Sequence, residues 1–328
     1  MDSLIFAINA IAPIVALIAI GYLLKRIGWI KADYARITNK LVFHVFLPVM
    51  LFLNVYKIDD LGQMDFSYIL YVMTIVLVLF FGAIPIVMLL VKAPAQRGVL
   101  LQSAFRSNYA LVGIPLAQSL FGEEGTMVAT LLSAVVVPSI NVLAVISLTV
   151  FRKGAEKPSV KKILLGIVKN PLIQAIFTGL AVLGIRALFE RGGIEFRISE
   201  IKPLFSVMNS LSALATPLAL LSLGAQFEFS AVAELKREIA FGTLMRTVVA
   251  PVLGIGLAYL LFADRFGGAH FAAFVAVFAT PVAISSVPMA QEMEGDVRLA
   301  GQLVVFSTLF SAVSIFLTAF LLRLVGIF

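Results

Sequence analysis

Long apolar runs are the feature that most constrains the fold of this chain. Charged or turn-rich segments separate ten such runs, and a helix that spans a bilayer needs about 20 mainly apolar residues. Inside hydrocarbon, backbone groups must find hydrogen-bond partners within the protein, which a helix achieves by itself. The sequence therefore predicts an all-α polytopic membrane protein with ten transmembrane helices, over 3–25, 39–56, 67–92, 98–121, 126–151, 162–186, 203–226, 238–262, 270–291 and 298–325.

The composition agrees with a chain that lies mostly in a lipid bilayer. Hydrophobic residues make up 61% of the sequence and charged residues 13%, whereas soluble domains have about 45–50% and about 25%. This argues against soluble enzymes, nucleic-acid-binding modules and disordered proteins. The chain has no cysteine and two histidines, so thiol chemistry is excluded and little is available for a metal site. We expect no enzyme activity, no resident metal and no cofactor.

The basic residues are distributed unevenly along the chain. Segments after the odd-numbered helices carry 16 Lys and Arg residues, and the opposite side carries 7. Because loops rich in Lys and Arg stay in the cytoplasm, the net charge of +7 indicates membrane topology rather than a nucleic-acid partner. The sequence predicts a multi-pass protein of the plasma membrane, in bacteria the inner membrane, with both termini outside the cytoplasm.

An internal repeat relates the two halves of the sequence. Residues 105–122 align with residues 278–295, and six positions are identical, including Pro115 with Pro288 and Gln118 with Gln291. With five helices in each half, the second half enters the membrane from the opposite face. The sequence therefore predicts two inverted repeats, 1–155 and 156–328, an architecture found in many secondary transporters.

The paired prolines lie inside apolar runs that are expected to be helical. A proline there removes a backbone hydrogen bond, which the membrane tolerates only where protein or a water-filled cavity covers the gap. We expect helices 4 and 9 to break at 113–115 and 285–288 and to cross there, with half-helices beginning at Pro115 and Pro288. The N-termini of these half-helices favour an anion, and the carbonyl ends before them favour a cation such as Na⁺. A simple kink is the alternative, but the repetition favours a functional crossover.

Two arginines lie deep within apolar runs. Arg106 is about nine residues beyond Arg97, or roughly 13 Å along a helix, and a charge at that depth is a candidate for function. It could bind an anionic substrate or pair with a carboxylate that locks the protein, and the residues leave both readings open. Arg246 lies at a similar distance from Arg237, and here extension of the side chain to the membrane surface is the favoured interpretation.

Polar and small residues around the expected breaks complete the candidate site. Hydroxyl groups in membrane helices often bond back to their own helix, and an intramembrane amide such as Asn141 can serve only to join helices. The candidates for substrate contact are Arg106, Asn108, Tyr109, Gly113, Ile114, Pro115, Asn141, Ser285, Ser286, Val287 and Pro288. Candidates for capping the crossover or binding an ion are Ser107, Gln118, Thr280 and Gln291.

Several of these motifs resemble the auxin efflux carrier family, which includes bacterial organic-acid permeases and plant PIN-type carriers. The matching segments are Phe105–Asn108 with Gly113–Leu116, 39–52, Asn170–Leu172, Thr216–Ala219 and Pro281–Pro288. The resemblance implies a scaffold of helices 1, 2, 6 and 7 and a transport domain of helices 3–5 and 8–10. It also implies a substrate site where helices 4 and 9 cross, elevator-type motion, and homodimers formed through helices 2 and 7. Sodium-coupled bile-acid-type symporters look like a more distant relative.

We therefore predict a secondary active or potential-driven carrier of small organic anions, such as malate, malonate or auxin-like acids, working by alternating access. The short segment between helices 5 and 6 favours an organic-acid permease over the plant carriers. A Na⁺-coupled anion symporter and a passive channel or membrane sensor are the alternatives. No residue pattern requires coupling to Na⁺ or H⁺, because the membrane potential alone supplies about 2.3 kcal/mol per charge at 100 mV.

Overall fold

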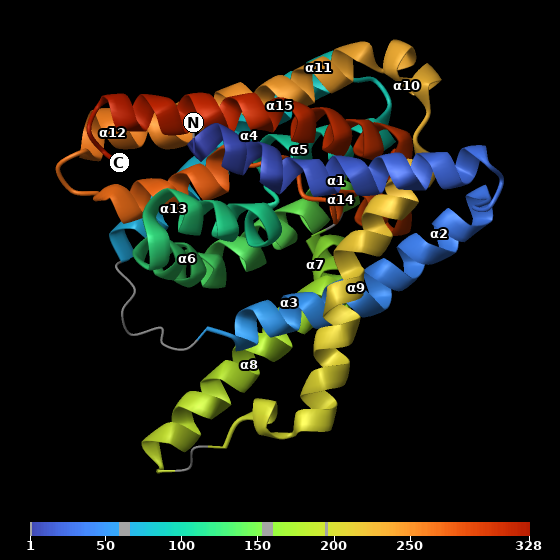
Figure 1. The fold of residues 1–328 in the computed structure, drawn as a ribbon. Coiled ribbons are helices and arrows are strands. Elements are labelled where there is room, and N and C mark those ends of the chain that lie inside the picture. Colours follow the sequence, from blue (N-terminus) through green and yellow to red (C-terminus); the bar gives the residue numbers. More distant parts are fainter. Residues whose placement is uncertain (1, 59–65, 153–159, 194–195) are drawn as a thin grey trace.

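The computed structural model describes residues 2–58, 66–152, 160–193 and 196–328, and all regular secondary structure in these ranges is helical (Figure 1). Within the described residues, seven helices are long and apolar enough to cross a membrane: 33–56, 66–90, 109–150, 171–190, 202–226, 236–262 and 297–324. The predicted all-α membrane architecture is confirmed at this level, because length and apolar character agree in the same segments.

The first half of the chain begins with a 25-residue helix and continues into a span assembled from three helical pieces. Gly122 adopts a φ of +59° and interrupts the long helix α6, so α6 contains both the end of the predicted fourth helix and the whole fifth. The elements are α1 (Asp2–Arg26), α2 (Ala32–Leu41), the π-helical turn η1 (Val42–Phe46), α3 (Leu47–Tyr56), α4 (Phe66–Leu90), α5 (Pro94–Phe105), the π-helical turn η2 (Tyr109–Gly113) and α6 (Ile114–Val150).

The second half again contains spans assembled from short pieces. Two π-helical turns lie within the span 236–262. The elements are α7 (Val160–Lys169), α8 (Pro171–Arg191), the 3₁₀ turn η3 (Ile198–Glu200), α9 (Lys202–Gln226), α10 (Phe229–Glu234), α11 (Lys236–Leu244), η4 (Met245–Val249), η5 (Val252–Gly256), α12 (Leu257–Phe262), α13 (Gly268–Phe278), α14 (Ser286–Glu292) and α15 (Val297–Leu324).

The predicted sixth helix, 162–186, is wrong at its start. The structure ends α7 at Lys169 and begins α8 at Pro171. The Asn170 side chain accepts hydrogen bonds from the backbone N–H groups of Leu172 (2.9 Å) and Ile173 (3.4 Å). Asparagine at the N-cap and proline in the first turn are both favourable helix starts. The cap therefore separates a short amphipathic helix from the long helix that follows.

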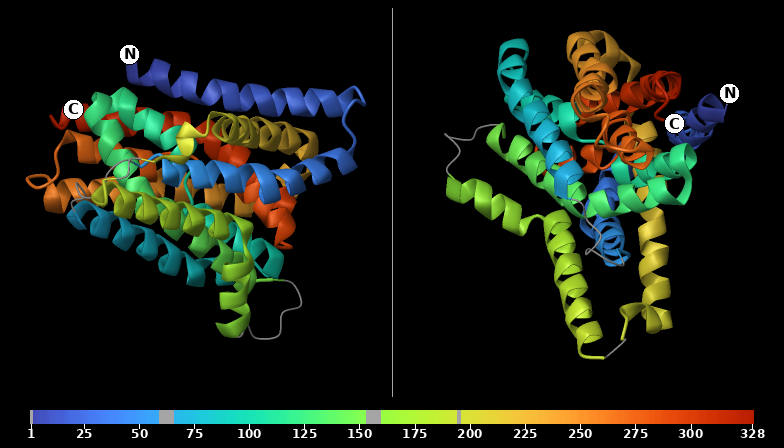
Figure 2. Two further views of the ribbon diagram at one scale, coloured as in Figure 1. Left: turned by 90° about the horizontal axis from the view of Figure 1, so that it is seen from below. Right: turned by 90° about the vertical axis from the view of Figure 1, so that its left-hand side faces the viewer.

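Small residues bring two long helices into close contact. A β-carbon added at Gly21 of α1 would overlap the backbone of Leu221 in α9, and one added at Gly224 would overlap that of Ile18. Helix α3 packs against α8 and α9, while α13 packs along α6. Figure 2 shows α8 and α9 extending away from the other helices. Small residues at helix interfaces permit this close approach, which gains van der Waals contact inside a membrane.

Two breaks interrupt the helical path, and the first is not where the proline suggested. Residues 106–108 separate α5 from η2, several positions before Pro115, and residues 279–285 separate α13 from α14. The π-helical turn η2 carries the helix through to Pro115, because the Ile114 N–H bonds to the carbonyl of Tyr109. Pro288 lies in the first turn of α14, where a missing N–H costs nothing. Neither proline therefore opens the chain at its own position.

Candidate functional site

The two breaks lie against each other and pair through their backbones. The Asn108 N–H donates to the carbonyl of Pro281 at 2.8 Å, and the Ala283 N–H donates to the carbonyl of Arg106 at 3.3 Å. Ser107 and Val282 form the centre of this short antiparallel bridge. The Ser307 hydroxyl of α15 accepts a further bond from the Val282 N–H at 3.0 Å. These bonds satisfy backbone groups that a broken membrane helix would leave unpaired.

Arg106 occupies the first break and is 1% exposed. Its acceptors are neutral: Nη1 donates to Gln102 Oε1 (3.0 Å), Ser286 Oγ (3.3 Å) and Met289 Sδ (3.0 Å), and Nη2 donates to Asn141 Oδ1 and Ser285 Oγ (both 2.9 Å). Among the described residues, no carboxylate is within ion-pair distance of the guanidinium. The predicted alternative of a carboxylate partner for Arg106 therefore finds no support within the described chain.

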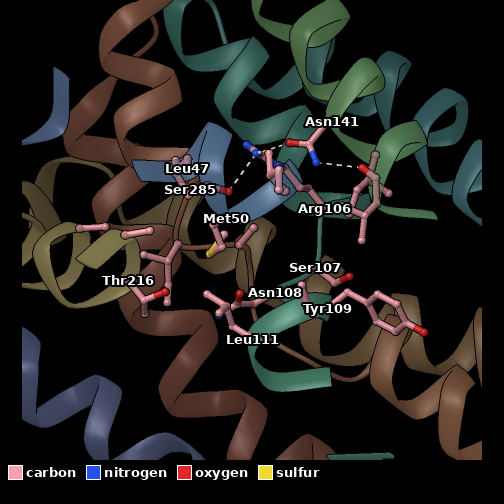
Figure 3. Close-up of a pocket in the computed structure, with 18 residues that line it drawn as sticks. Leu47, Met50, Arg106, Ser107, Asn108, Tyr109, Leu111, Asn141, Thr216 and Ser285 are labelled. Atoms are coloured by element: carbon pink, nitrogen blue, oxygen red, sulfur yellow. Dashed lines mark hydrogen bonds between the residues drawn. The ribbon is translucent and has the colours of Figure 1, made fainter. Parts of the chain in front are cut away.

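A cavity of about 50 Å³ adjoins Arg106, large enough for a few water molecules. Figure 3 shows side chains from both breaks converging on it. Helices α3, α6 and α9 and the π-helical turn η2 supply the rest of the wall. The lining residues are Leu47, Met50, Leu51, Arg106, Ser107, Asn108, Tyr109, Ala110, Leu111, Val137, Ile140, Asn141, Ala215, Thr216, Ala219, Ala283, Ile284 and Ser285.

Asn108 contributes an unsatisfied donor to this wall. Asn108 is 5% exposed, and among the described residues its buried Nδ2 atom has no hydrogen-bond partner. The buried hydroxyl of the neighbouring Ser107 likewise has no partner in this part of the chain. Leaving a buried polar group unpaired costs about 1–3 kcal/mol. The cavity wall therefore contains residues with unused hydrogen-bonding capacity as well as an arginine whose acceptors are all neutral.

The structure brings Asn141, Ser285 and Ser286 to Arg106 and adds two residues that were not predicted. Asn141 Nδ2 donates to the Val137 carbonyl at 2.8 Å, so its oxygen faces the guanidinium. The added residues are Gln102 and Met289. Gln102 lies four positions before Arg106 on a helix, and this spacing was the available signal. The cavity residues of α3 and α9 were also missed, although Thr216 lies in a family motif.

Other predicted residues do not present polar groups to the cavity. The Tyr109 hydroxyl donates to the Ala129 carbonyl at 2.6 Å, and its ring points away from the cavity centre (Figure 3). Thr280 bonds back to Ala276. Gly113 allows close packing, because an added β-carbon would lie 2.7 Å from the Ala276 carbonyl oxygen. Ile114, Pro115, Val287 and Pro288 are also absent from the cavity wall.

The two repeat-related glutamines have different surroundings. Gln118 is exposed and is not part of the cavity wall. Gln291 accepts from Asn39 Nδ2 at 3.0 Å and donates to the Arg36 carbonyl at 3.0 Å. Gln291 thus joins α14 to α2 and does not cap the crossover. The two glutamines, predicted as candidates for capping the crossover or binding an ion, therefore face different neighbours although they occupy matching positions in the repeat.

Arg246 is fully buried and does not extend to the membrane surface as the sequence suggested. Its Nε donates to the Thr280 carbonyl at 2.8 Å and its Nη2 to the Val277 carbonyl, while Nη1 finds no partner in the described part of the chain. These carbonyls lie at the C-terminal end of α13, which carries partial negative charge. Arg246 therefore stabilises a helix end created by the second break.

Comparison with known proteins places the chain in a family. The model of the family described as "Membrane transport protein" matches residues 6–319. An uncharacterized transporter of Methanothermobacter thermautotrophicus is 25% identical over 317 residues, covering 94% of this chain and 95% of the relative. One of Methanocaldococcus jannaschii is 24% identical over 321 residues, covering 96% and 98%. The chain therefore belongs to the membrane transport protein family, the auxin efflux carrier family that its motifs resemble, and is a multi-pass membrane protein.

Proposed function

We propose that this protein is a secondary transporter of small organic anions, and that a substrate carboxylate binds in the cavity between the paired breaks and helices α3 and α9. The observation that carries the proposal is the environment of Arg106. A buried guanidinium with neutral acceptors is costly in a membrane. A carboxylate offsets that cost, because it accepts short, charge-assisted bonds from arginine.

The neighbouring groups fit the same ligand. Asn108 Nδ2 can donate to a carboxylate oxygen and has no partner within the residues that the structure describes. Ser285 already lies within hydrogen-bond distance of Arg106 and can exchange its bond when the substrate enters. Apolar residues such as Met50 and Leu111 line the other side, which suits the carbon skeleton of an organic acid better than an inorganic anion.

The cavity is too small to hold the proposed substrate without a conformational change. A space of about 50 Å³ is smaller than a dicarboxylate, so binding requires α3 and α9 to separate from the two breaks. In the proposed elevator mechanism, α1, α2, α3, α8 and α9 form the scaffold and α4–α6 with α10–α15 form the transport domain. Packing of α1 on α9, of α3 on α8 and of α13 on α6 supports this grouping.

The proposal also includes the membrane topology and the assembly of the protein. Ten spans form inverted repeats over 1–155 and 156–328, with both termini outside the cytoplasm and the chain in the bacterial inner membrane. Two copies pair through the second and seventh helices, α3 and α9. Exposed apolar residues along α9, among them Leu204, Val207 and Leu214, support such a contact. The buried charges around the breaks are positive, which favours movement of the anion without a bound cation.

Counterflow in proteoliposomes tests the proposed function. Vesicles loaded with one unlabelled carboxylate are given the labelled acid outside, with and without Na⁺ and at several external pH values. We expect saturable exchange for at least one carboxylate, retained without Na⁺, and no exchange of its uncharged amide analogue. Exchange that requires Na⁺ would replace the proposal with a cation-coupled symporter. Unsaturable flux would indicate a channel, and no exchange across a broad panel of acids would overturn the anion assignment.

A further inference from the structure

The helix α7 is too short to cross the membrane. Its ten residues, Val160–Lys169, extend about 15 Å at 1.5 Å per residue, half the roughly 30 Å thickness of a hydrocarbon core. The cap at Asn170 and Pro171 ends α7 and starts the long helix α8, and Figure 2 shows the chain turning sharply there. The helix is thus a separate element at one end of the protein.

Its packing fixes its depth relative to the spanning helices. Gly166 of α7 faces Thr149, since an added β-carbon would lie 3.4 Å from the Thr149 hydroxyl oxygen. Thr149 is the last residue but one of α6. Immediately beyond that end, Arg152 pairs with Glu294, where both side chains are about half exposed. The contact therefore places α7 at the level where α6 leaves the membrane.

The free surface of α7 combines large apolar side chains with lysines. Leu164 is 56% exposed, Leu165 49% and Val168 64%, whereas Ile163, Gly166 and Ile167 are partly covered. Lys161 and Lys169 are also exposed, and the helix sequence contains no acidic residue. Apolar side chains on this scale are costly in water, and lysine ammonium groups are costly in hydrocarbon. The boundary between lipid tails and headgroups accommodates both.

We propose that α7 is an interfacial helix that binds anionic phospholipids in the leaflet at this end of the molecule. Leu164 and Val168 enter the acyl region, while Lys161 and Lys169 contact the phosphate groups. Charge decides between lipid classes, because each basic residue near an anionic surface strengthens binding by roughly five-fold. A zwitterionic lipid offers the same apolar region without the net charge. The proposed lipid site is independent of the transported substrate.

Fluorescence quenching by brominated lipids tests this site without measuring transport. The chain has one tryptophan, Trp29, so a full-length protein that carries both Trp29→Phe and Leu164→Trp reports from α7 alone. This α7 reporter is reconstituted in mixtures of brominated phosphatidylcholine and unbrominated phosphatidylglycerol. We expect phosphatidylglycerol to displace the quencher from the α7 reporter with a several-fold preference. Adding Lys161→Gln and Lys169→Gln, or raising the salt concentration, should bring that preference close to one.

A tryptophan in α4 is the matched control. Val78 is exposed near the middle of a helix without charged residues. An α4 reporter, made by Val78→Trp in the Trp29→Phe background, should therefore be quenched with no preference between the lipids. Equal affinity of the two lipids at the α7 reporter would overturn the anionic-lipid assignment. Absence of quenching at the α7 reporter, with normal quenching at the α4 reporter, would overturn the interfacial position itself.

Discussion

Two buried arginines accompany the two breaks, and their partners differ in kind. Arg106 contacts side chains from α5, α6 and the start of α14, and it borders a cavity. Arg246 contacts backbone carbonyls at the end of α13, and it is absent from that cavity wall. Both are almost completely buried. Two equally buried residues of the same type therefore differ in their hydrogen-bond acceptors, which are side chains for Arg106 and backbone carbonyls for Arg246.

The difference between side-chain and backbone acceptors has a physical consequence for the two arginines. Side-chain acceptors such as Ser285 Oγ and Asn141 Oδ1 can rotate away and let a substrate carboxylate take their bonds. Backbone carbonyls at a helix end cannot rotate without unwinding the helix, and they carry the negative end of its dipole. Arg106 is consequently suited to exchange partners during a transport cycle. Arg246 is suited to hold one conformation of the second break.

The largest expected effect is on substrate binding in Arg106→Gln. A charge-assisted, two-point contact with a carboxylate contributes on the order of 3 kcal/mol, so affinity should fall about 100-fold while the melting temperature stays equal or rises. Substrate titrations followed by intrinsic fluorescence or calorimetry measure the affinity. The Arg323→Gln protein is the control, because Arg323 is exposed in the last turn of α15. Wild-type affinity in Arg106→Gln would remove Arg106 from the site.

Arg246→Gln should lower stability and leave substrate affinity nearly unchanged, the opposite of the pattern expected for Arg106→Gln. Loss of the bonds to the carbonyls of Thr280 and Val277 should destabilise the fold by about 2 kcal/mol, which lowers the melting temperature by several degrees. Substrate affinity of the folded protein should remain within a few-fold of wild type. The comparison between the arginines fails if this variant keeps its stability and loses its affinity instead.

A smaller loss of substrate affinity is expected at one polar residue of the first break, Asn108, and none at Thr280 of the second. Asn108→Ala removes an unpartnered donor from the cavity wall, and the loss of one hydrogen bond to the substrate should reduce affinity about five- to ten-fold. Thr280→Val removes a hydroxyl that bonds back to Ala276 and should leave affinity unchanged. Titrations of both variants with the same acid provide the measurement, and equal losses would contradict the proposal that Asn108 contacts the substrate and Thr280 does not.

The smallest effect is expected at an ion pair outside the spans. Arg152 donates to Glu294 from the end of α6, and this contact lowers the pKa of the Glu294 carboxyl. A lowered pKa in the folded state gives stability that is present above the unfolded-state pKa and is lost as the pH falls through the folded one. Melting curves from pH 7 to pH 3 should show a slight acid-dependent loss in wild type that Glu294→Gln lacks. Exposure keeps the effect small, and substrate affinity at pH 7 should not change.

Much of the candidate site could be predicted from residue type and depth. Polar groups within an apolar membrane run are costly and are therefore candidates for function. This argument predicted Arg106, Asn108, Asn141, Ser285 and Ser286. The position of the first break could not be predicted, because a π-helical turn moved it away from Pro115. The surroundings of Gln118 and Gln291 could not be predicted either, since a repeat in sequence preserves spacing but not the neighbours that each side chain meets.

The membrane class and the all-helical architecture follow from the sequence alone, because the length of an apolar run and the period of a helix are local properties. The tertiary structure alone decided what the buried charges contact. Arg106 meets Ser286, a residue 180 positions away, and Ser107 pairs with Val282. Such contacts depend on how two breaks pack against each other, which no local pattern specifies. Two arginines that look alike in sequence thereby acquire different acceptors and, in our proposal, different roles.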